Sequence, residues 1–102
     1  MNRDQRAVRA AAERDGWPNT MCQWAGCCDR AVNAAHILPK SRYPELRADI
    51  KNLISLCRYH HSISENRADR VMLLRLMAEL HGYDYSQEPY SEYKEEYHDT
   101  VR

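Results

Sequence analysis

The sequence contains no apolar run long enough to cross a bilayer, and its first residues lack the apolar core of a signal peptide. It also shows no internal repeat and no change of composition that would mark a second domain. A chain of 102 residues has room for one modest core, whose stability is marginal unless a further cross-link such as a metal ion supports it. We therefore expect one cytoplasmic domain, not associated with a membrane, in which a bound metal would help the fold.

The formal net charge is zero, because 15 Lys and Arg residues balance 15 Asp and Glu residues. The balance hides an asymmetry: residues 1–82 hold 13 basic against 9 acidic side chains, and residues 83–102 hold 2 against 6. We expect a single domain over residues 1–82, with a core motif at 22–65, followed by an acidic, tyrosine-rich tail. The basic body permits a polyanion partner. The tail could pack on the domain, order on a protein partner or stay mobile.

The four cysteines could form two disulfides in a secreted protein or supply metal ligands in a reducing cytosol, and the missing signal peptide favours ligands. A structural zinc ion takes four ligands, usually as two close pairs from two loops. Cys22 and Cys27 are one such pair, and Cys57 and His60 are the other. The sequence therefore predicts a structural zinc site of three cysteines and one histidine.

Cys28 competes with Cys27 for the same position. Gly26 directly precedes Cys27 and relieves the backbone where a thiolate must turn inward. We therefore assign Cys27 as the ligand and expect Cys28 to be a spare thiol.

Helix caps and breakers predict the elements around these pairs. Asn2 and Gln5 suit the start of a helix, and Asn66 and Gly82 suit the start and end of another. In chain order we expect a helix at 3–14, a strand at 31–37, a surface loop at 40–51, a strand at 53–57, a short helix at 58–65 and a helix at 67–81.

The helix at 67–81 is apolar around most of its circumference, with only Arg75 and Glu79 forming a narrow polar strip. A helix of this kind needs cover on several sides. We expect either central burial or a homodimer interface, and the sequence does not choose between them.

The order His36, Asn52, His61, interleaved with the two zinc-ligand pairs, resembles the HNH endonuclease family. The resemblance covers residues 22–65. It implies an α+β fold, a small ββα-metal (His-Me finger) domain with structural zinc and flanking helices. It also implies a metal-dependent endonuclease of phage or bacterial origin that hydrolyses phosphodiester bonds in duplex DNA. Each active site would nick one strand and leave 5′-phosphate and 3′-hydroxyl ends.

Phosphodiester hydrolysis needs a deprotonated water and neutralisation of the developing charge, which one imidazole and one divalent cation can supply. By resemblance, His36 is the general base and Asn52 holds the loop and strand that aim it. His61 would bind the catalytic Mg2+ or Mn2+, together with Glu65 four residues later on the same helix face. The family usually has a metal-binding Asp or His just before the base, whereas this chain has Ala35.

Five basic side chains lie on or beside the loop between the two expected strands, where they would either neutralise DNA phosphates or remain solvated surface charges. They are Lys40, Arg42, Arg47, Lys51 and Arg58.

Two alternatives to an enzyme follow from Ala35 and from the acidic tail. One is a non-catalytic, zinc-stabilised nucleic-acid-binding module, and the other is an accessory subunit of a larger nuclease or packaging assembly.

Overall fold

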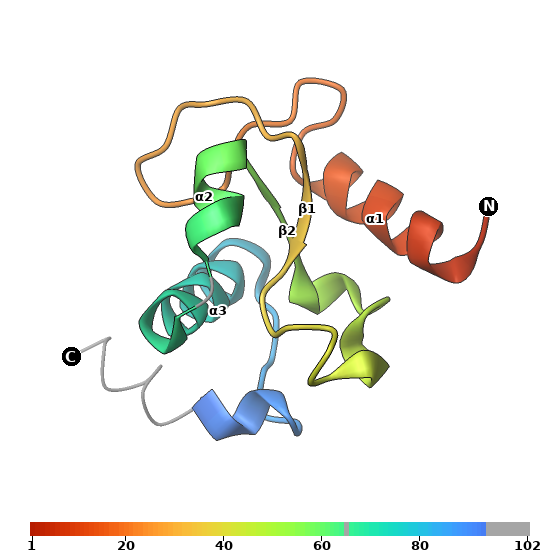
Figure 1. Ribbon diagram of the computed structural model, residues 1–102, viewed down its shortest axis with the longest axis vertical. Coiled ribbons are helices and arrows are strands. Elements are labelled where there is room, and N and C mark those ends of the chain that lie inside the picture. Colours follow the sequence, from red (N-terminus) through yellow and green to blue (C-terminus); the bar gives the residue numbers. More distant parts are fainter. Residues whose placement is uncertain (65, 94–102) are drawn as a thin grey trace. The chain divides into compact units, whose positions relative to one another are not determined.

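The computed structural model describes residues 1–64 and 66–93. Its described residues contain three α-helices and one two-stranded antiparallel sheet, so the fold is a small α+β fold (Figure 1). The chain divides into two compact units, residues 1–64 and residues 65 onward. The domain expected at 1–82 spans this division, because the helix at 67–81 belongs by its contacts to the second unit.

Helix α1 spans Arg3–Arg14, as predicted. Its capping box is formed by two hydrogen bonds: the side chain of Asn2 accepts from the backbone N–H of Gln5 at 2.8 Å, and the side chain of Gln5 accepts from that of Asn2 at 2.9 Å. Gly16, with φ 108°, follows the helix in the left-handed region of φ that glycine tolerates. The start and end of this helix are therefore set by local sequence.

Strand β1 spans Asn33–His36 and pairs antiparallel with β2, which spans Leu53–Leu56. Ala35 lies opposite Ile54 in the register. Both strands are shorter than predicted. All four residues of β2 are buried, so this strand forms the centre of the first unit.

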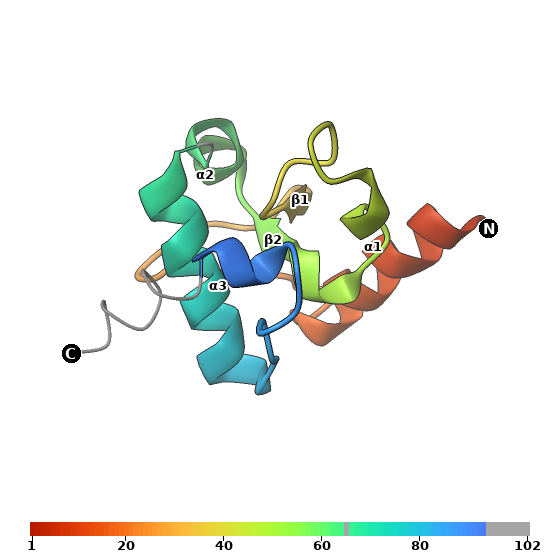
Figure 2. The ribbon, with the colours of Figure 1, turned by 90° about the horizontal axis from the view of Figure 1, so that it is seen from below.

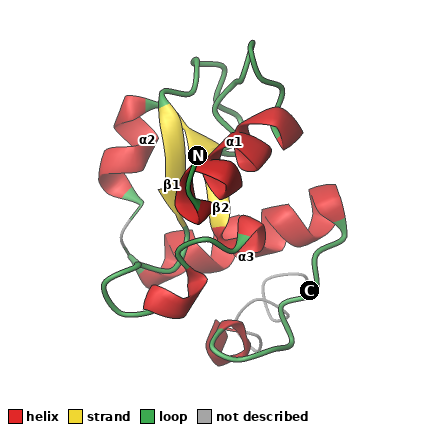
Figure 3. Cartoon of the chain, turned by 90° about the vertical axis from the view of Figure 1, so that its right-hand side faces the viewer, coloured by secondary structure: helices red, strands yellow, loops and turns green. Residues whose placement is uncertain are grey.

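Helix α2 spans Arg58–Ile63 and follows β2 directly. The side chain of Cys57 caps it by accepting from the backbone N–H of His60. In Figures 1, 2 and 3 the two strands lie between α1 and α2, and α2 returns beside the sheet. The chain order strand, strand, helix thus matches the order that the sequence predicts.

A buried ion pair fastens the end of α1 to β2. Arg14 and Asp15 form a bidentate contact, with Nε and Nη2 of the arginine 2.8 and 2.9 Å from the two carboxylate oxygens. The guanidinium also donates to the carbonyl of Leu53 at 2.6 Å, and the carboxylate accepts from the backbone N–H of Ser55 at 3.1 Å. Because Asp15 has no exposed side-chain surface, both charges depend on these partners.

The segment between the strands is more ordered than the expected surface loop. It contains two short 3-10 helices, Pro44–Leu46 and Ile50–Asn52. Tyr43 and Leu46 are buried in it, and Asp49 caps the second of these helices by accepting from the backbone N–H of Lys51. The loop is thus held by its own apolar and capping side chains.

In the second unit, helix α3 spans Arg67–His81, with Asn66 as its N-cap and Gly82, φ 68°, as its left-handed C-cap. Its buried residues are Val71, Leu73, Leu74 and Met77. The homodimer stays a prediction. Among the described residues, no helix has the length and apolar character needed to span a membrane.

Part of the expected tail is folded onto the second unit itself. Residues 90–93 form a short 3-10 helix, and Tyr90 and Tyr93 are buried. The guanidinium of Arg67 lies 4.4 Å from the ring centroid of Tyr93 and donates to the carbonyl of Glu92 at 3.1 Å. Glu92 and Tyr93 therefore contact the start of α3, and residues 94–102 lie outside the described residues.

Candidate functional site

The four predicted zinc ligands come together in the first unit. One ligand atom from each of Cys22, Cys27, Cys57 and His60 lies within 4.8 Å of the others. The two pairs come from different parts of the chain, the first from the loop before β1 and the second from the start of α2. This cluster, called the Cys3His cluster below, is compatible with a structural zinc ion.

Local hydrogen bonds shape the loop that carries the first pair. The backbone N–H of Cys22 donates to the carbonyl of Asp29 at 2.8 Å, and that of Cys27 donates to the carbonyl of Trp24 at 3.0 Å. Gly26, with φ 82°, occupies the left-handed region in this turn, as expected from its place before Cys27. Cys28 is exposed and lies outside the cluster.

The imidazole of His60 is aimed at the sulfurs. Its Nδ1 lies 3.6 Å from Sγ of Cys22 and 3.3 Å from Sγ of Cys57. Ligands at ordinary Zn–S and Zn–N bond lengths lie about 3.6 Å apart in a tetrahedron. The nitrogen and these two sulfurs are therefore spaced as ligands of one ion.

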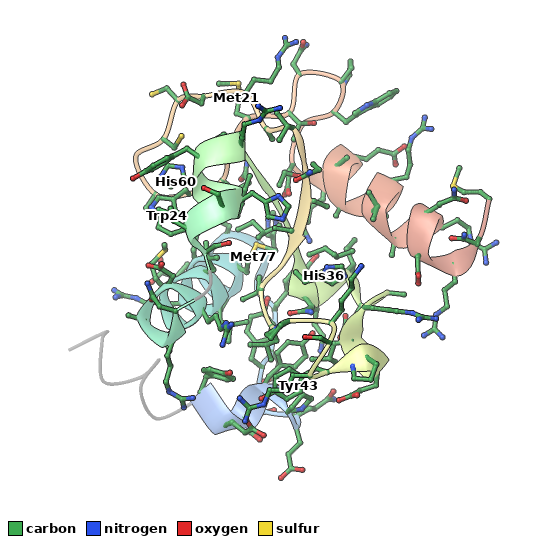
Figure 4. The ribbon with its side chains drawn as sticks, viewed as in Figure 1. Met21, Trp24, His36, Tyr43, His60 and Met77 are labelled. Atoms are coloured by element: carbon green, nitrogen blue, oxygen red, sulfur yellow. The ribbon has the colours of Figure 1, made fainter. Side chains whose placement is uncertain are left out.

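Trp24 fixes the plane of this imidazole. The two rings, labelled in Figure 4, stack with centroids 4.4 Å apart and planes 13° apart. Tyr59 contacts His60 edge-on, with ring centroids 5.1 Å apart. No sequence motif assigned a role to Trp24. Its place between two cysteine ligands was the available signal.

The two buried thiols differ in acidity without a bound cation. Burial raises the pKa of the Cys22 thiol from 9.0 to about 11. The backbone N–H of His60, which donates to Sγ of Cys57 at 3.5 Å, lowers the pKa of the Cys57 thiol. Cys57 is thus the more readily ionised of the two, and binding a cation would release the proton held by Cys22.

Asn52 occupies the other end of the sheet and is completely buried. Its side-chain oxygen accepts from the backbone N–H of Leu38 at 2.8 Å, and its side-chain nitrogen donates to the carbonyl of Leu38 at 3.0 Å and of Leu46 at 3.4 Å. The amide therefore ties the loop after β1 to the start of β2.

His36 is the last residue of β1 and is half-buried (Figure 4). Its Nε2 lies 3.0 Å from the carbonyl oxygen of Arg47. A carbonyl only accepts, so Nε2 carries the proton in this contact. In the neutral ring, Nδ1 then keeps the lone pair that can accept a proton.

The predicted cation ligands are less fully described. His61 is exposed on α2, one residue after the cluster ligand His60. Helix α2 ends at Ile63, and Glu65 lies outside the described residues. Ala35, at the position where the resembled family has a metal ligand, is buried at 3% exposure.

Four of the five predicted phosphate-binding side chains are exposed: Lys40, Arg42, Arg47 and Arg58. Lys51 is half-buried. Two of them have partners within the protein, since Arg47 forms an ion pair with Asp4 at 3.4 Å and Arg42 lies 5.6 Å from the ring centroid of Tyr43. Arg47 is therefore neutralised within the protein, whereas Lys40, Arg42 and Arg58 face solvent.

Comparisons with known proteins found no match: no protein-family model, curated protein or solved structure matches the chain.

Proposed function

We propose that the protein is a metal-dependent endonuclease of the HNH type, with a zinc-stabilised ββα-metal fold, that hydrolyses phosphodiester bonds in DNA. The observation that carries the proposal is the orientation of His36. Its ring is held at Nε2 by a backbone carbonyl, at the end of a strand whose following loop is tied down by the buried Asn52.

In this proposal His36 is the general base. With Nε2 donating to Arg47, the free nitrogen Nδ1 takes a proton from the attacking water. The carbonyl partner also stabilises the imidazolium that results, because its oxygen still accepts from the charged ring. Asn52 acts as a positioning residue, since its three side-chain hydrogen bonds fix the loop that follows the strand.

The two metals have separate roles. Zinc in the Cys3His cluster would fasten α2 to the loop at 22–27 and so set the position of His61. His61, with Glu65 as the proposed second ligand, would hold Mg2+ or Mn2+, which would supply charge neutralisation at the scissile phosphate. The exposed side chains of Lys40, Arg42 and Arg58 would contact the flanking phosphates.

A second candidate function is a zinc-stabilised nucleic-acid-binding module without catalysis. The buried Ala35 favours it, because a residue that cannot ligate a cation stands where the family has a ligand. The two candidates share the fold, the zinc and the basic surface. They differ in whether a cation and His36 act on a phosphate.

A plasmid-nicking assay with and without Mn2+ tests the proposal. The zinc-loaded protein should nick supercoiled DNA only with the cation, and H36A should reduce the rate by about 10²- to 10⁴-fold, the usual contribution of a general base. Arg6→Ala, an exposed change on α1 outside the proposed site, serves as the matched control and should keep full activity.

Circular dichroism and zinc content must be unchanged in H36A for the comparison to hold. Equal nicking by H36A and the parent protein would remove His36 as the base. DNA binding by a parent protein that never nicks would establish the binding module instead.

A further inference from the structure

The two outer edges of the β1–β2 sheet differ in whether their backbone groups have hydrogen-bond partners. The strand register pairs alternate residues, so that the backbone groups of Leu53 and Ser55 on β2, and of Ala34 and His36 on β1, point away from the partner strand. These outward N–H and C=O groups must find other partners, meet water or pair with another strand.

The β2 edge is closed by the chain itself. Arg14 donates to the outward carbonyl of Leu53, and Asp15 accepts from the outward N–H of Ser55. The carbonyl of Ser55 accepts from the backbone N–H of Gln23 at 2.9 Å. The N–H of Leu53 donates to the carbonyl at position 50. All four outward groups of this edge are thus satisfied.

The β1 edge is open. Within residues 1–64 and 66–93, no hydrogen bond reaches the outward N–H or C=O of Ala34 or His36. The strand carries neither proline nor a charged lysine or glutamate of the kind that commonly blocks such an edge. Four backbone groups are therefore left for an added strand.

A trough lined by both apolar and polar residues lies beside this open edge, next to α1. It has a volume of about 370 Å³, and its lining includes Ala34 and the cross-strand neighbour Ser55. Exposed apolar side chains form its walls, with Val8 at 40%, Trp17 at 50% and Val32 at 60% exposure. A second trough of about 560 Å³ along α1 shares Val8 and Trp17, so the apolar surface continues along the helix.

We propose that the β1 edge binds an extended segment of a partner protein, which adds a third strand to the sheet. The segment pairs with the outward groups of Ala34 and His36 and places alternate apolar side chains in the trough beneath α1. One site thereby supplies both parts of strand addition, the free backbone groups and the pocket for alternate side chains. This inference does not depend on nuclease activity.

Charge indicates which segment fits. Arg30 lines the trough, is exposed, and forms no ion pair within the described part of the chain. Arg9, which lies 4.5 Å from the ring centroid of Trp17, is already paired with Glu13 at 3.3 Å, so Arg30 is the charge that the trough offers to a partner. A partner segment with an acidic residue beside its apolar ones would pair with Arg30, whereas a second copy of the chain has no acidic side chain within β1 to offer it.

The test is an amide NMR titration of the zinc-loaded protein with the peptide acetyl-Glu-Val-Thr-Val-Thr-Val-amide. A second peptide carries the Glu at its C-terminal end instead, so that both parallel and antiparallel pairing with β1 are covered. Saturable shifts are expected at the amides of Ala34 and His36. Peptides N-methylated on the residues that would pair should shift neither signal. V8D, which places a carboxylate in the trough wall, should weaken binding at least tenfold.

Leu80→Asp is the matched control, an exposed leucine in the second unit at 55% exposure, and should leave the affinity unchanged. Circular dichroism establishes that both variants are folded. Absence of shifts at millimolar peptide, or shifts that survive N-methylation, would overturn the proposal. Concentration-dependent shifts of the same amides without peptide would make a second copy the occupant and overturn it equally.

Discussion

The two ends of the β1–β2 hairpin are held by different chemistry. At one end the Cys3His cluster brings together four side chains, two from the loop before β1 and two from the start of α2. At the other end one buried amide, Asn52, makes three hydrogen bonds to backbone groups of the loop. The first end would depend on a metal ion that the cluster could hold, whereas the second depends only on the chain. A chelator should therefore separate them, since it can act on one end alone.

The largest effect is expected from removing the zinc ion that the Cys3His cluster would hold. Structural zinc contributes about 10–16 kcal/mol in small zinc domains, which equals or exceeds the total stability of a domain of this size. Cys57→Ser removes a ligand, and a strong chelator removes the ion, so either should abolish cooperative unfolding of residues 1–64. Thermal denaturation followed by circular dichroism measures this, with one zinc per chain by elemental analysis in the parent. A metal-free protein that keeps its full melting transition would refute the role of zinc.

The next effect concerns the buried pair that fastens α1 to the middle of the hairpin. D15N removes the charge that balances Arg14, and we expect a loss of about 3–4 kcal/mol because the guanidinium stays buried without its counter-ion. Urea denaturation of the zinc-loaded protein gives the value. Glu13→Gln is the matched control, because its ion pair with Arg9 is exposed and should contribute less than about 1 kcal/mol. Equal losses in the two variants would mean that burial does not decide the strength of the pair.

A somewhat smaller effect is expected at the end that binds no metal. Asn52→Ala leaves the N–H and C=O of Leu38 without their partner, which should cost about 2–3 kcal/mol. Zinc content should stay at one per chain, since the cluster is at the opposite end. Asn19→Ala, at an exposed asparagine, should change the free energy of unfolding little. Loss of zinc in the Asn52 variant would show that the two ends are coupled rather than independent.

The smallest effect is predicted for the spare thiol. Cys28→Ser should change stability by no more than about 0.5 kcal/mol and leave one zinc per chain, because the side chain is exposed and outside the cluster. A zinc titration of the variant beside the parent gives both quantities. A clear drop in affinity would make Cys28, not Cys27, the ligand.

Local sequence determined most of the secondary structure. The caps at Asn2 and Asn66 and the glycine at 82 predicted the bounds of α1 and α3, because capping groups act on backbone atoms only a few residues away. The spacing of the cysteines and of His60 predicted the ligand set for the same reason, since the two members of a pair are only five or three positions apart.

Tertiary structure alone decided how these parts are joined. Nothing near Arg14 and Asp15 in the sequence shows that this adjacent pair bonds backbone groups of Leu53 and Ser55, about forty positions away. Nothing near Asn52 shows that it bonds Leu38 and Leu46. The bond from His36 to the carbonyl of Arg47 also depends on where the intervening loop returns. Such contacts join a side chain to backbone groups that are distant in the chain, and every residue type carries the same backbone groups, so only the folded path of the chain can choose among them.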